Sequence, residues 1–119
     1  MEIVSFISIE DDPPDLIISF ALWEADLDDI RSLILMRTPE YEVFLYESER
    51  GVKVSDEAWL NEEDDMLKKI EFSDDLVRII TNHNQFELDL RKVDKEEIEQ
   101  AKNLLERMNF DNCFEIQII

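Results

Sequence analysis

The side chains that could carry chemistry in this sequence are mostly carboxylates. The 119 residues include 31 acidic against 12 basic ones, a formal net charge of −19, and no Lys or Arg occurs in the first thirty. A field of this sign repels phosphate backbones and anionic lipid, and it attracts basic surfaces. The charge therefore argues against nucleic acid and membranes as direct partners and favours a basic protein.

Two acidic segments stand out as candidate binding sites. One is a run of four carboxylates that follows an aromatic residue, and the other is a group of three aspartates nearer the N-terminus. An aromatic side chain supplies contact area, and the charges around it steer a basic partner. The alternative is that both segments are solvated turns. The predicted partner-binding residues are Trp59, Glu62, Glu63, Asp64, Asp65, Asp26, Asp28 and Asp29.

The aspartates at 26, 28 and 29 are spaced like the start of a calcium-binding loop, but the rest of the loop is missing. The loop glycine is absent, and Arg37 stands where the final glutamate ligand would be. Carboxylate pairs for acid–base work could be drawn almost anywhere in so acidic a chain, so no particular pair is informative. We expect no specific metal site.

The residues that usually act as nucleophiles, bases or phosphate binders are nearly absent. His83 is the single histidine, between two Asn in a predicted turn, and cannot form a triad or a two-histidine metal site alone. Cys113 is the single cysteine and is expected to pack against its neighbours. Gly51 is the single glycine, so a glycine-rich phosphate loop is excluded. We expect no enzyme activity and no cofactor.

Alternating apolar and polar residues predict a chain rich in β-strands. The segment 32–37 is a nearly continuous apolar run, which is typical of a central strand buried on both faces. The segment 58–65 is predicted to be an irregular or briefly helical acidic loop. The predicted strands cover residues 1–10, 16–24, 32–37, 41–48, 52–56, 66–72, 76–81, 86–91 and 114–119.

One amphipathic helix is predicted over residues 94–108. Asp94 and Glu97 have capping-box spacing. An apolar stripe at helical spacing consists of Ile98, Ala101, Leu104, Leu105 and Met108. Together with the strands, this helix predicts a single α+β domain over residues 1–119. We expect a mainly antiparallel, curved or partly closed sheet, a C-terminal helix packed on it and a short final strand.

The sequence shows no basic segment followed by a long apolar run, so we expect no signal peptide and no membrane span. A single cysteine fits a reducing compartment, and a cytoplasmic location is expected.

The order of these segments resembles a known class of proteins. A short apolar strand ends in a basic residue (Leu33 to Arg37), an aromatic acidic segment follows (Tyr41 to Glu47), and a late helix carries Leu104 and Leu105 before a terminal strand. Over roughly residues 15–110 this pattern is similar to the immunity proteins of bacterial polymorphic toxin systems, above all to the immunity protein ten family. The resemblance implies a small, mostly β, cytoplasmic protein that binds a cognate toxin and blocks it.

Two hypotheses on function follow. The first is an immunity or inhibitor protein that binds a basic, possibly nuclease, toxin stoichiometrically through an acidic surface. The second is a structural or adaptor domain that self-associates through a sheet edge such as 114–119, so that either a monomer or a homodimer is compatible with the sequence.

Overall fold

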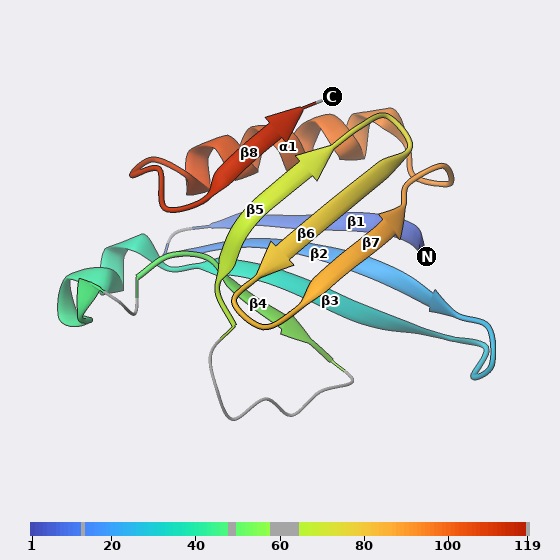
Figure 1. Cartoon of the computed structure of the whole chain (residues 1–119), viewed down its shortest axis with the longest axis horizontal. Helices are drawn as coiled ribbons and strands as arrows, with labels where there is room; N and C mark the ends of the chain where they lie inside the picture. The colour runs from blue at the N-terminus through green and yellow to red at the C-terminus, as the bar shows by residue number, and fades with distance from the viewer. Residues whose placement is uncertain (13, 48–49, 58–64, 119) are drawn as a thin grey trace.

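The computed structural model describes residues 1–12, 14–47, 50–57 and 65–118 (Figure 1). Its elements, in chain order, are β1 (Glu2–Asp12), β2 (Asp15–Glu24), β3 (Asp29–Arg37), the 3₁₀ helix η1 (Pro39–Phe44), β4 (Lys53–Asp56), β5 (Leu67–Phe72), β6 (Leu76–Thr81), β7 (Gln85–Asp89), α1 (Lys95–Met108) and β8 (Glu115–Ile118). The predicted α+β class is confirmed.

The strands form one mixed sheet in the order β4-β3-β2-β1-β7-β6-β5-β8. Neighbouring strands are antiparallel except at β1–β7 and β5–β8. The β1–β7 pairing joins only Glu2 to Leu88 and Ile3 to Asp89. The sheet therefore has an N-terminal half (β1 to β4) and a C-terminal half (β5 to β8), whose strands cross in Figure 1.

The sheet also curls back on itself at the far end of the N-terminal half. An isolated bridge pairs Lys53 with Met66, just before β5. On either side of it, the Val54 amide donates to the Asp65 carbonyl at 2.8 Å and the Leu67 amide to the Val52 carbonyl at 2.9 Å. The two halves are thus tied at both sides of the core they share, as a partly closed sheet.

The predicted helix packs into this core along the predicted stripe. Its five apolar residues are all buried, and they join the inner faces of both sheet halves in one cluster. The predicted capping box does not form, because Asp94 makes no side-chain cap hydrogen bond. Glu97 instead accepts the Ile7 amide in the middle of β1 at 2.9 Å, and Arg107 pairs with Asp11 near the C-terminal end of that strand. The helix is therefore held along the second half of β1.

The predicted strand at 41–48 is wrong, because the chain forms η1 there. Pro39 lies in the first turn of η1, where its fixed φ and missing amide are tolerated. The apolar alternation at Tyr41, Val43 and Leu45 does not mark a buried face, because all three side chains are exposed.

The prediction that β3 is buried on both faces is also wrong. Leu33, Leu35 and Arg37 are buried, whereas Ile34 is half-buried and Met36 is exposed. The apolar run reflects one buried face and one outer face that is itself apolar. No helix in the described part of the chain is long and apolar enough to cross a membrane.

Candidate functional site

The outer face of the N-terminal half is unusually poor in charge. Strand alternation directs Leu16, Ile18, Phe20 and Leu22 of β2 inward, and the intervening residues outward. Across β2 and β3 the outward residues pair as Ile17–Met36, Ser19–Ile34, Ala21–Ser32 and Trp23–Ile30. We call the surface of Phe6, Ile17, Ser19, Trp23, Ile30, Ser32, Ile34 and Met36 the apolar face; Ala21 lies among these residues but is itself buried.

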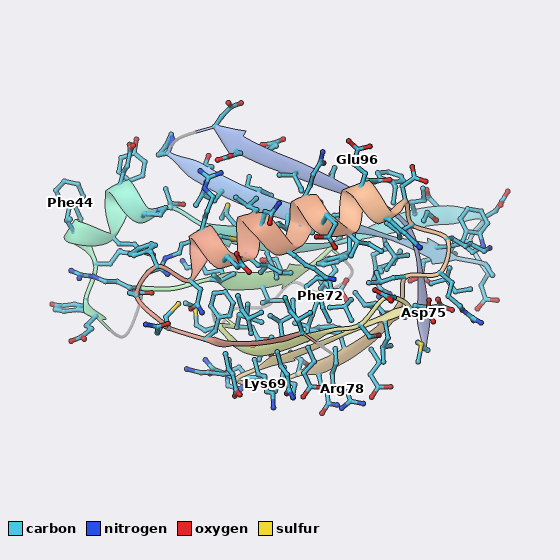
Figure 2. The ribbon with its side chains drawn as sticks, turned by 90° about the horizontal axis from the view of Figure 1, so that it is seen from above. Phe44, Lys69, Phe72, Asp75, Arg78 and Glu96 are labelled. Carbon is cyan, nitrogen blue, oxygen red and sulfur yellow. The ribbon has the colours of Figure 1, made fainter. Side chains whose placement is uncertain are left out.

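The outer face of the C-terminal half is built differently. Lys69 lies 3.2 Å from Glu71, and Arg78 lies 3.3 Å from Glu71 and 3.1 Å from Glu87. Lys69 and Arg78 project away from the helix in Figure 2. Paired charges of this kind are ordinary for a sheet face in water, so the apolar face is the exception in this molecule.

Exposed carboxylates surround the apolar face. Only three basic residues lie in β1 to β4, and two of them, Arg31 and Arg37, lie on the opposite, inner side. Lys53 is thus the one basic side chain that the described strands of this half place beside the face. The exposed acids near its edges and ends are Glu10, Asp26, Asp28, Asp29, Glu40 and Glu57.

One end of the apolar face is the β2–β3 turn, which carries three of the predicted binding residues. Asp26, Asp28 and Asp29 are all exposed there, and Asp28 has a left-handed φ of 49°. Leu27, between them, is 76% exposed. The turn follows the Trp23–Ile30 pair, so an apolar tip and three charges extend the apolar face at this end.

The other end is η1, the strongest concentration of exposed apolar side chains in the described residues. Phe44 and Tyr46 are more than 80% exposed, and Phe44 points away from the body in Figure 2. Tyr41, Val43 and Leu45 are also exposed. Such a patch on a monomer usually marks an interaction site. Sequence reasoning missed it by assigning these residues to a strand.

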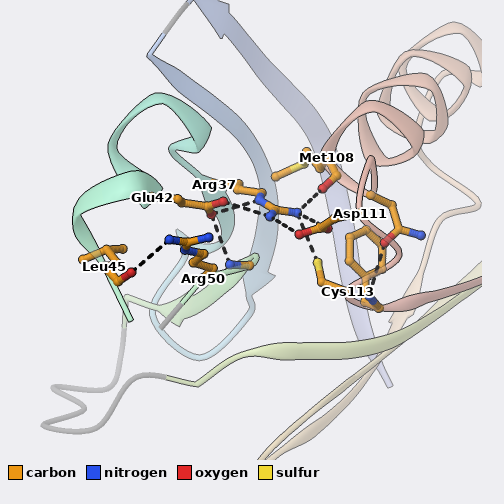
Figure 3. A network of polar contacts seen from close by, with 10 residues as sticks. Arg37, Glu42, Leu45, Arg50, Met108, Asp111 and Cys113 are labelled. Atoms are coloured by element: carbon orange, nitrogen blue, oxygen red, sulfur yellow. Dashed lines mark hydrogen bonds and ion pairs between the residues drawn. The ribbon is translucent and has the colours of Figure 1, made fainter. Parts of the chain in front are cut away.

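A buried ion pair holds η1 in place (Figure 3). Arg37, at the end of β3, donates from Nε and Nη2 to the two carboxylate oxygens of Glu42, each at 2.9 Å. Glu42 also accepts the Gly51 amide at 3.1 Å. Gly51 has a φ of 127°, in the left-handed region that favours glycine. One guanidinium thus fixes both η1 and the chain that leads into β4.

The same guanidinium reaches the end of α1. Its Nη1 donates to the Met108 carbonyl at 2.6 Å, and both terminal nitrogens donate to Asp111 at 2.8 and 2.9 Å. The Phe110 ring stacks on it at 4.1 Å. Burial alone would lower the pKa of Arg37, but its hydrogen bonds to Asp111 and Glu42 raise that pKa above its ordinary value. The arginine therefore stays charged.

We call the ion pairs of Arg37 with Glu42 and Asp111 the clamp. A small hollow lies between the clamp and the apolar face. Its volume is about 190 Å³, enough for one side chain. Arg37 and Glu42 meet each other at this hollow, so their charges are already matched. The lining residues are Met36, Arg37, Thr38, Tyr41, Glu42, Leu45, Gly51 and Lys53. Because Met36 belongs to both, the hollow connects η1 with the apolar face.

Asp65 is the one residue of the predicted acidic run 62–65 that the structure describes. Asp65 is buried, and its oxygens accept the Thr81 hydroxyl at 2.6 Å, the Asn84 amide side chain at 2.9 Å and the His83 backbone amide at 3.1 Å. It organises the β6–β7 turn, where His83 was predicted to lie. Trp59, Glu62, Glu63 and Asp64 lie outside the described residues.

No catalytic or metal-binding arrangement emerges in the described ranges. No group of three or more His, Cys, Asp or Glu side chains there could hold a metal ion. Cys113 is half-buried with Sγ 3.2 Å from Arg37 Nη1, and burial raises the pKa of its thiol. A raised pKa disfavours the thiolate that a nucleophile needs.

Comparison of the chain with protein-family models, curated proteins and solved structures finds no match. The function must therefore be argued from the surface itself.

Proposed function

We propose that this protein is a non-catalytic inhibitor that binds a basic protein and blocks it, in the manner of an immunity protein that neutralises a toxin. The observation that carries the proposal is η1: a run of exposed aromatic and aliphatic side chains that a buried arginine clamp holds in one conformation. A preorganised aromatic anchor loses little entropy on binding, so its contact area converts efficiently into affinity.

The charge of the molecule supports a basic partner. At −19 the protein attracts cations over a distance comparable to its own size at low salt, which raises the association rate. Fast capture suits an inhibitor of a toxin that acts inside the cell that makes it. The proposal includes a cytoplasmic location, no cofactor and no metal, and it carries the resemblance to immunity protein ten as an expectation.

The test uses the purified protein and each basic protein encoded beside its gene. We expect one of them to form a 1:1 complex, to lose its activity in that complex, and to associate more slowly as salt increases. The variant Phe44→Ser should weaken the complex, whereas Ile118→Ser, an exposed apolar residue on β8, should not. If no basic neighbour binds or is inhibited, the proposal is wrong.

The charges at the β2–β3 turn allow a matched control. The double reversal Asp28→Lys with Asp29→Lys should slow association and weaken its dependence on salt. Asp74→Lys with Asp75→Lys makes the same change of charge on the exposed β5–β6 turn. Equal effects of the two reversals would mean that only net charge matters and that the β2–β3 turn is not part of the contact.

The second candidate is self-association through β8. This strand is at the end of the sheet order and pairs only with β5, so its other edge is unpaired with any described strand. Two copies of a chain at −19 repel each other, which disfavours a dimer at low salt. Sedimentation velocity tests this candidate. A dimer that the variant Gln117→Pro converts to monomer would support it.

A further inference from the structure

We infer that the apolar face is the central contact surface of this protein, and that its occupant is a basic protein domain whose own contact surface has an apolar centre and a lysine- or arginine-rich rim. The inference rests on the proposed function for the charge of the partner. It adds which face is used and what the partner must present to it.

The two outer faces of the sheet differ in their side chains. Both belong to one sheet and both look away from the core, yet one carries the Lys69–Glu71–Arg78–Glu87 ion-pair chain and the other carries Ile17, Ile34 and Met36. A sheet face that meets only water gains nothing from such residues, and a large exposed apolar patch risks aggregation. An interface accounts for the difference.

The charges around that face are complementary to a basic partner. The centre of a protein interface is depleted in charge, and its rim is polar. Here the centre is uncharged, and the exposed carboxylates of Glu10, Asp26, Asp28, Asp29, Glu40 and Glu57 outnumber Lys53, the one basic side chain that the described strands of this half place beside the face. A basic rim on the partner matches this pattern, whereas a second copy would set acid against acid.

The apolar face is small. Ile30 and Met36 are six residue steps apart, which is about 20 Å at ~3.3 Å per residue, and four strands are about 14 Å wide. That area is well below the roughly 800 Å² that each side of a stable interface buries. A partner that fills the face must therefore also cover an end of it, the β2–β3 turn or the hollow beside η1. A folded domain has that reach.

The test locates the binding sites of two peptides on the ¹⁵N-labelled protein. It measures the change in NMR chemical shift of each backbone amide when a peptide is added. Oligolysine offers charge alone, and a peptide of alternating lysine and leucine offers charge together with an apolar side. We expect the lysine–leucine peptide to shift the amides of residues 17–23 and 30–36, and to do so still at about 0.15 M salt, where the Debye length is ~8 Å. Oligolysine should shift mainly the acidic turns and be displaced by that salt.

Matched variants locate the apolar contribution. Ile34 and Ile80 are both half-buried, outward-facing isoleucines on strands with a neighbour on each side. Ile34→Ser should weaken the affinity for the lysine–leucine peptide by about tenfold, because apolar contact area is removed. Ile80→Ser should leave that affinity unchanged. Met36→Ser, at a more exposed position, serves if Ile34→Ser proves poorly folded by circular dichroism.

Three results with the peptides would overturn the inference: identical shift patterns for the two peptides, shifts centred on the C-terminal half, or equal effects of Ile34→Ser and Ile80→Ser. Concentration-dependent shifts at residues 17–36 without peptide would identify a second copy as the occupant and overturn it too. The lysine–leucine peptide could bind the apolar face as expected while no basic neighbour is inhibited. That combination would support this contact surface and reject only the proposed inhibitor function.

Discussion

Arg37 and Glu42 form a two-point ion pair inside the protein, with Nε and Nη2 each 2.9 Å from one carboxylate oxygen. Arg37 is 1% exposed and Glu42 is 7% exposed. The pair joins the last residue of β3 to the middle of η1, so a segment with a solvent-exposed outer side is fixed from beneath by charges that water hardly reaches.

Removing one partner of this pair should strongly destabilise the protein. Arg37→Met leaves Glu42 buried without its counter-ion, and we expect a loss of about 3–5 kcal/mol in the free energy of unfolding, measured with urea. The double variant Arg37→Met with Glu42→Leu should lose less, because no charge remains buried. Arg107→Met, which breaks the exposed pair with Asp11, should cost under about 1 kcal/mol. Equal losses for Arg37→Met and Arg107→Met would contradict the clamp.

Acid should weaken the clamp through Asp111. The hydrogen bond from Arg37 lowers the pKa of Asp111 from 3.8 to about 2. The unfolded chain therefore takes up this proton first, and the stabilisation that is complete above about pH 4 is lost as the pH falls through about 2. Because the side chain is 41% exposed, we expect only about 1 kcal/mol.

The measurement compares Asp111→Asn with the parent protein in urea at several pH values. The gap between the two should close between about pH 4 and pH 2. Asp89 has a pKa that Arg91 also holds at about 2, but it is present in both proteins and cancels. A gap that stays constant over this range would show that Asp111 does not titrate with the clamp.

Asp65 should behave as a structural residue in experiments. Asp65→Asn replaces an acceptor of three hydrogen bonds with an amide that also donates, so we expect a loss of about 1–3 kcal/mol in the free energy of unfolding. Once folded, the variant should bind a basic partner at the parent rate. A variant of parental stability that associates more slowly would instead return Asp65 to the binding surface predicted from sequence.

Salt should raise the melting temperature of the isolated protein. The radius of gyration is 13.8 Å. This is shorter than the Debye length at 0.01 M salt (~30 Å) and longer than the Debye length at 0.1 M salt (~10 Å). Screening should relieve the self-repulsion of −19 charges, and each ~1 kcal/mol gained is about 4 °C at this size. Melts in rising NaCl test this, with sucrose at matched osmolality as the uncharged control; no upward shift contradicts it.

Local pattern was sufficient to predict most of the fold. Alternation placed β2, β6 and β7, and the apolar stripe around Ala101 and Leu105 placed α1. It failed at Tyr41 to Leu45, because alternation records which residues are apolar and not whether anything covers them. Pro39 was the one local signal for η1.

The candidate site was harder to predict because its parts are distant in sequence. Arg37 depends on Asp111 and on the carbonyl of Met108, contacts that only the tertiary fold creates. An arginine at the end of an apolar strand is the available signal, since such a charge must find partners when buried. Conversely, Asp65 belongs to an acidic run in the sequence, but in the fold it accepts hydrogen bonds from the β6–β7 turn.

The short pairing of Glu2 and Ile3 with Leu88 and Asp89 also bears on how the chain folds as it is synthesised. Strands β1 to β4 are neighbours in sequence and can pair as soon as they leave the ribosome, but β5 to β7, α1 and β8 are made after them. Until then, the inner residues of the first four strands have no helix or second half to cover them. The nascent chain thus passes through a stage in which both apolar faces of these strands are exposed. Its dense negative charge then has a second consequence, because chains of like charge repel each other and associate less at this stage.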